Sequence, residues 1–219
     1  MNNYLEDYVE RALKTHEVLW CVDGMSRRIA HLAKALSHSH EQVKWLEGLD
    51  YDSDICNLEK WFVKFWRHGS KTRVRGLWFG MFTPVVNNKP AYDLHCQAAT
   101  SFQLNDVFCD WAQDIVDESL LARSEILDQF YQFDGEVSDG KFDTEFLALG
   151  YGMMAIDAIF KSVGKELFGE QSVGLALGWD AGSPVYFGSI EKGEWRLMSR
   201  SEVTDGQGLM ARTFMARYP

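Results

Sequence analysis

The sequence predicts an α+β fold in which a helical N-terminal layer covers an antiparallel sheet. Three observations support this class. Apolar residues recur at helical spacing over the first 70 residues, β-forming runs gather in two later regions, and helices and strands do not alternate regularly. Because no linker-like segment interrupts the chain, we expect a single domain, 1–219, with a helical layer at about 1–70 and a mixed part at about 71–219.

Four helical segments are expected in the N-terminal layer, because apolar residues recur there every three or four positions and so share one helix face. Polar or glycine-containing stretches separate these segments and supply capping residues. The segments lie at residues 3–17, 25–37, around 43–46 and 55–66.

The sheet is expected from two separate regions. Residues 72–102 contain two runs of β-branched and aromatic residues on either side of the turn Asn87 to Pro90, so we predict an antiparallel hairpin. Residues 172–198 contain three short runs separated by turn-like stretches, so we predict a three-stranded β-meander.

Helices are expected between these two regions. The spacing predicts an amphipathic helix over 104–118, a helical continuation over 120–133, a loop over 134–141 and a long apolar helix over 144–168. In the first of these, Val107, Phe108, Trp111 and Ile115 form an apolar stripe that should face the core. The tail from Ser201 has no clear pattern.

Composition and cysteine usage predict a soluble cytoplasmic protein. The longest uncharged stretch, Gly76 to Asn88, has 13 residues, whereas a membrane-spanning helix needs roughly 20. No charged segment followed by an apolar one opens the chain. The four cysteines form no CxxC pair, so we expect reduced thiols, mostly buried, and neither a zinc ribbon nor a redox site. They are Cys21, Cys56, Cys96 and Cys109.

The net charge of −10 is concentrated in one part of the chain. Leu104 to Glu145 holds twelve acidic residues against Arg123 and Lys141 alone, so this segment accounts for the whole excess. Such a surface repels phosphate, which argues against nucleic acid and anionic membranes as partners and favours a cationic partner. A solvated face that keeps the protein soluble is the alternative.

Within the expected helix 104–118, four aspartates recur at gaps of 4, 4 and 3 and would form one stripe. Like charges at this spacing repel by a few tenths of a kcal/mol per pair. We therefore interpret the stripe and its continuation as a docking surface for a cationic protein, with a solvated face or a divalent-cation site as alternatives. The candidate partner-binding residues are Asp106, Asp110, Asp114, Asp117, Glu118, Asp134, Glu136, Asp139 and Asp143.

Three other patterns are weaker candidates for chemistry. Gly150 to Ala155 matches the dinucleotide fingerprint GxGxxA, but only 69 residues follow Gly150, so glycines that ease helix packing are the better interpretation. Asp93 and His95 share one strand face and could serve acid–base chemistry. His31, His38 and His40 are close enough in sequence for a metal site, although a solvated helix end explains them as well. We expect no metal, no cofactor and no catalytic residue.

Two glycine-bounded strands, Gly76 to Phe82 and Val173 to Asp180, resemble strands of the immunity proteins that neutralise bacterial toxins. The resemblance implies a cytoplasmic bacterial inhibitor whose acidic surface steers association with a basic toxin and covers its cleft. Two alternatives stay open. One is a small-molecule-binding or hydrolytic enzyme that uses Asp93 and His95. The other is a subunit of a stable complex in which some of the eight tryptophans anchor the interface.

Overall fold

The computed structural model describes residues 10–21, 23–68, 71–83, 85–86, 89–90, 92–119, 121–134, 141–179 and 182–206. The helices are η1 (Glu17–Trp20), α2 (Met25–Ala35), α3 (His40–Glu47), α4 (Tyr51–Arg67), η2 (Asp110–Gln113), α5 (Glu125–Asp134) and α6 (Lys141–Phe168). The strands are β1 (Gly76–Phe82), β2 (Val85–Val86), β3 (Lys89–Pro90), β4 (Asp93–Ala99), β5 (Ile115–Glu118), β6 (Ala122–Arg123), β7 (Val173–Trp179), β8 (Gly182–Glu191) and β9 (Glu194–Leu197). Residues 10–16 and 200–206 are also helical.

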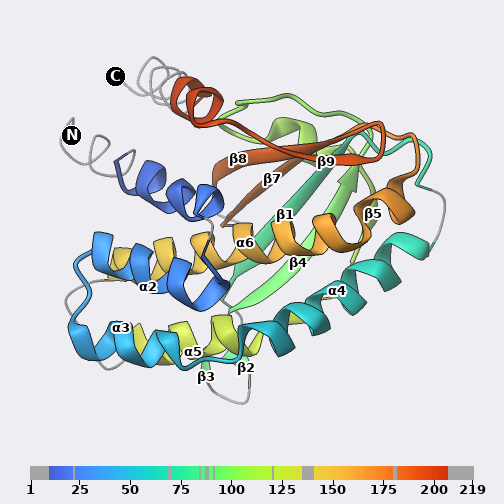
Figure 1. Ribbon diagram of the computed structural model, residues 1–219. Helices are drawn as coiled ribbons and strands as arrows, with labels where there is room; N and C mark the ends of the chain where they lie inside the picture. Colours follow the sequence, from blue (N-terminus) through green and yellow to red (C-terminus); the bar gives the residue numbers. More distant parts are fainter. Residues whose placement is uncertain are drawn as a thin grey trace.

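The main sheet has seven strands in the order β5-β4-β1-β7-β8-β9, with β6 beside β4 (Figure 1). The predicted hairpin is confirmed, because β1 pairs antiparallel with β4 from Gly76 opposite Ala99 to Phe82 opposite Asp93. The predicted meander is confirmed in β7, β8 and β9. Hairpin and meander join through a parallel β1–β7 pair, which the sequence did not predict. The α+β class is confirmed.

Side chains on the strands alternate between two apolar cores. Leu77 and Phe79 belong to the larger core, which contains residues of α2, α4 and α6, and Figure 1 shows α4 and α6 packed across the strands. Trp78 lies between them in the chain and belongs to a second core with Trp111 and Tyr186. Because successive strand residues point to opposite faces, both faces of the sheet are covered.

The predicted apolar helix is confirmed as α6, which runs through the whole GxGxxA pattern without a break. A Cβ on Gly150 would lie 2.5 Å from the side chain of Leu32 on α2, so the glycine permits close helix packing, as predicted. Residues 144–168 are long and apolar enough to cross a membrane by composition, but most of them are buried against the rest of the protein.

The helix predicted over 104–118 is wrong. The segment forms a loop with the short 3-10 helix η2, followed by strand β5. The Asp106 carboxylate accepts hydrogen bonds from the backbone N–H groups of Phe108 (3.1 Å) and Asp110 (2.8 Å), and Cys109 has a left-handed φ of 51°. Aspartates that bind nearby backbone groups compete with helix formation. The helix predicted over 120–133 is likewise replaced at its start by β6, and α5 begins at Glu125.

The predicted N-terminal helices correspond to helical residues 10–16, α2, α3 and α4, while residues 3–9 of the first lie outside the described residues. The four cysteines are unpaired. Cys96 and Cys109 are buried, Cys21 is half-buried and Cys56 is exposed, so burial holds for only part of the set.

A buried carboxylate connects three helices. Asp54, in the first turn of α4, accepts hydrogen bonds from Ser124 Oγ (2.6 Å), from the backbone N–H of Glu125 (2.8 Å) and from the hydroxyl of Tyr151 on α6. Ser124 Oγ also accepts the backbone N–H of Leu127 at 3.0 Å, so it caps α5. Burial raises the pKa of Tyr151, which keeps its hydroxyl a donor to Asp54.

We expect Asp54→Asn to lower the free energy of unfolding by about 2–4 kcal/mol, because it removes a buried charged acceptor from three donors. In a domain of this size the melting temperature should then fall by roughly 5–15 °C. Thermal and urea unfolding measure both values. The control is Asp52→Asn, which changes an exposed aspartate in the same turn and should cost less than about 1 kcal/mol. Equal losses in the two variants would contradict the role of Asp54.

Candidate functional site

The predicted acidic residues do not form one helical stripe. Asp106, Asp110 and Asp114 lie in the loop around η2, and Asp117 and Glu118 lie on β5. Asp134 ends α5 and Asp143 falls in the first turn of α6. Glu136 and Asp139 are outside the described residues.

Several of these carboxylates bind groups of the protein itself. Asp114 Oδ2 accepts from Ser101 Oγ at 2.9 Å. Asp117 forms an ion pair with Lys71, a lysine that is only 5% exposed and lies 4.4 Å from the ring centroid of Phe65. Asp117 therefore has a structural role, because it neutralises a buried lysine. Asp106 also supports the fold of the segment, through its bonds to the backbone of Phe108 and Asp110. Asp110, Asp114 and Glu118 are exposed.

A buried tyrosine fixes the acidic loop to the sheet. Tyr186 on β8 donates its hydroxyl proton to the carbonyl oxygen of Asp106 (2.8 Å) and accepts from Trp111 Nε1 (3.1 Å). A Cβ on Gly76 would lie 2.5 Å from the Trp111 ring, so this glycine lets the indole lie directly against β1. The loop therefore presents its acidic residues from a rigid support.

The same segment carries the exposed large apolar side chains of the described part of the chain. Leu104 is 50% exposed, Ile115 45%, Val116 46% and Leu121 55%. Ile115 was expected to face the core with Trp111. Trp111 is buried and Ile115 is not, because β5 replaces the expected helix. Ile115 and Val116 are adjacent, and neighbouring exposed apolar side chains with a polar rim are typical of protein interaction sites.

Strand β5 is an edge strand. It pairs with β4 on one side and ends the strand order on the other, so its outer backbone groups have no strand partner among the described residues. The β4–β5 register shifts here, because Asp117 pairs with Ala98 but Ile115, two residues earlier, pairs with Ala99. Ile115 and Val116, at this irregularity, are both about half exposed. Natural proteins usually protect such edges, and an open one can accept a partner chain.

We call Asp110, Asp114, Ile115, Val116 and Glu118 the acidic edge. From Leu104 to Glu118 the sequence has five acidic residues and no lysine or arginine. The predicted partner-binding acids thus fall beside apolar residues that the sequence did not single out as exposed. The sequence contained one indication of strand β5, because the β-branched pair Ile115-Val116 favours a strand over a helix.

The second predicted pair, Asp93 and His95, is buried on β4. His95 Nδ1 lies 3.6 Å from Glu118 Oε1. Asp93 is 6% exposed, stands opposite Arg123 in the β4–β6 pairing, and its Oδ1 atom has no hydrogen-bond partner. Arg123 Nε donates instead to Asp128 Oδ2 at 2.7 Å. Burial, and then the Asp128 carboxylate, raise the pKa of Asp93, and Arg123 opposes them.

The three histidines of the candidate metal site lie on different elements. His31 is exposed on α2, His40 begins α3, and His38 lies between the helices with a buried Nε2 atom that has no hydrogen-bond partner. Burial lowers the pKa of His38. Among the described residues no group of three or more His, Cys, Asp or Glu side chains is arranged to hold a metal ion.

We expect Asp93→Asn to raise the melting temperature at pH 7. A carboxyl whose pKa is raised by folding stabilises the protein below its unfolded-state pKa, and this stability is lost as pH rises through the folded pKa. The gain in the variant should therefore shrink toward zero near pH 4, close to the usual aspartate pKa of about 3.9. Melting curves between pH 4 and 7 test this, with exposed Glu47→Gln as the control. A variant less stable than wild type at pH 7 would contradict it.

Comparisons with protein-family models, with curated proteins and with solved structures found no match to this chain.

Proposed function

We propose that the protein binds a basic partner protein through the acidic edge, and that it acts as an inhibitor of the kind represented by bacterial toxin immunity proteins. The observation that carries the binding proposal is the coincidence of two properties in one segment. Among the described residues, the exposed large apolar side chains lie between residues 104 and 121, a stretch with five acidic residues and no lysine or arginine.

The two properties have complementary roles in binding. Apolar residues at the centre of an interface supply affinity when they are desolvated, whereas charged residues at the rim steer encounter and exclude wrong partners. Ile115 and Val116 provide the apolar centre, and Asp110, Asp114 and Glu118 provide the charged rim. A cationic partner matches this rim, because like-charged proteins would be repelled.

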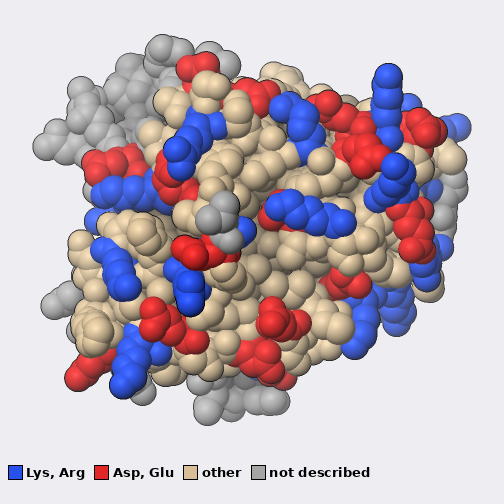
Figure 2. All heavy atoms as spheres, viewed as in Figure 1, with Lys and Arg blue, Asp and Glu red and all other residues tan. Residues whose placement is uncertain are grey.

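Charge is more evenly mixed on the helical side of the molecule. Figure 2 shows basic and acidic side chains interspersed over the helical side of the molecule. Ion pairs such as Arg67–Glu166 (2.5 Å) and Lys14–Glu10 (2.7 Å) balance charges there. The acidic edge is therefore a distinct electrostatic feature, which supports a steering role for it.

The inhibitor class rests on the sequence resemblance and on the acidic, apolar-centred surface together. An enzyme that uses Asp93 and His95 is the second candidate, favoured by the buried carboxylate oxygen of Asp93 that has no partner. Both side chains are only 6% exposed, which leaves little surface for a substrate to reach. Protein binding is therefore the better-supported function.

We expect the double variant Asp110→Lys/Asp114→Lys to associate with the partner about tenfold or more slowly at low salt, because it reverses two exposed charges of the rim. The difference should shrink as salt rises past physiological strength, where the Debye length is about 8 Å. The partner is first isolated from the source organism by affinity capture and purified. Stopped-flow kinetics at two salt concentrations then measures association, and the inhibitor class is tested by whether the protein blocks the partner's toxicity.

The matched control is Glu47→Lys/Glu170→Lys, which makes the same change in net charge at two exposed positions outside the segment. Both lie near helix C-termini, where lysine is tolerated. Equal slowing in the two double variants would mean that only net charge matters, and it would remove the acidic edge from the proposal.

A further inference from the structure

A cleft of about 300 Å³ lies where helical residues 10–16 and η1 meet α2 and the C-terminal helical residues 200–206. Its apolar lining comes from Val18, Leu32 and Ala35. The volume is at the lower end for small-molecule sites. It is about the volume that ten water molecules occupy in liquid water. A group the size of one aromatic ring with a small head group fills such a space.

The charged lining of this cleft is opposite in sign to the protein as a whole. Basic side chains come from three elements: Lys14, Arg28 and Arg200, with the imidazole of His31 beside them. The single carboxylate in the lining, Glu17, already pairs with Arg200 Nη2 at 2.8 Å. Lys14 pairs with Glu10, which lies outside the lining, at 2.7 Å. Three basic groups therefore face two carboxylates, and the local charge stays positive in a protein with a net charge of −10.

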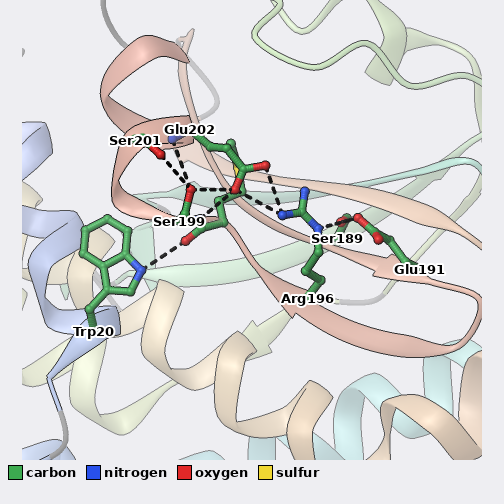
Figure 3. A network of polar contacts seen from close by, with 8 residues as sticks. Trp20, Ser189, Glu191, Arg196, Ser199, Ser201 and Glu202 are labelled. Atoms are coloured by element: carbon green, nitrogen blue, oxygen red, sulfur yellow. Dashed lines mark hydrogen bonds and ion pairs between the residues drawn. The ribbon is translucent and has the colours of Figure 1, made fainter.

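The Arg200 side of the cleft is rigidly built. Ser199 and Glu202 form reciprocal bonds at the start of the C-terminal helix, with Ser199 N donating to Glu202 Oε2 (2.8 Å) and Glu202 N donating to Ser199 Oγ (3.3 Å). Arg196 bridges Glu202 and Glu191, as Figure 3 shows.

Trp20 ties this turn to η1. Its Nε1 donates to the carbonyl oxygen of Met198 at 3.0 Å, and Arg200 lies 5.4 Å from the indole centroid (Figure 3 shows Trp20 beside the turn). On the opposite wall, Arg28 donates through Nε to the carbonyl oxygen of Asp23 at 2.6 Å. Within the described part of the chain, its two Nη groups make no hydrogen bond that would compete with an anion. The cationic groups are thus positioned before any ligand binds.

We propose that this cleft binds a small organic anion with a compact apolar body and a phosphate or carboxylate head group. Guanidinium groups match the paired oxygens of both head groups. The apolar lining distinguishes such a ligand from an inorganic ion, and the basic rim distinguishes it from a neutral molecule. The site lies on other elements than the acidic edge, so the inference does not depend on the proposed protein-binding function.

Phenyl phosphate is the probe that tests this site. Isothermal titration with the full chain should show saturable binding. Arg28→Gln should weaken binding about tenfold or more. The control is Arg27→Gln on the same helix, an exposed arginine that does not line this cleft, and it should leave affinity within about twofold. Lys14→Gln is the second test variant if melting curves show that Arg28→Gln unfolds.

Two further ligands separate the parts of the proposal. Benzyl alcohol keeps the apolar body without the charge, and inorganic phosphate keeps the charge without the body. Each should bind about tenfold or more weakly than phenyl phosphate. Equal binding of either ligand, equal losses in the Arg27 and Arg28 variants, or no saturation below about 10 mM phenyl phosphate would overturn the proposal.

Discussion

The buried carboxylate of Asp54 is the interaction on which the arrangement of the helices depends. A single aspartate on α4 satisfies donors from the start of α5 and from α6, and α6 packs on strands β7, β8 and β9. An ionised group can be buried in this way only when hydrogen bonds replace its lost hydration. Because Ser124 directly follows β6, the same contact also fixes the end of the segment that runs from the acidic loop through β5.

The acidic edge is a consequence of how the second face of the sheet is covered. Instead of a helix, a loop held by Tyr186 and Trp111 closes that face, and the chain then leaves it as a short edge strand. Asp106 and Asp117 bind groups of the protein itself and support the fold, whereas Asp110, Asp114 and Glu118 are exposed. The charge excess is therefore divided between acids that shape the loop and acids that are open to a partner.

Much of the fold could be predicted from the sequence, because periodicity reports on burial. The hairpin, the meander and α6 follow from their patterns, and the glycine at 150 was correctly assigned to packing. The 104–118 segment was predicted wrongly, because its aspartates fall at helical spacing. Asp106 instead binds local backbone N–H groups, and Asp117 binds Lys71, which only the tertiary structure brings near. The cleft could not be predicted from the sequence either, because Lys14, Arg28 and Arg200 are far apart in the chain.

The central claim is that β5 and the preceding loop are the docking surface, and backbone hydrogen exchange tests it most directly. With the purified partner added, we predict slower exchange of the amides of residues 113–118, because binding at an open edge removes them from water. Protection confined to the helical side, for example to α2 and α3, with no change in β5 would contradict the claim.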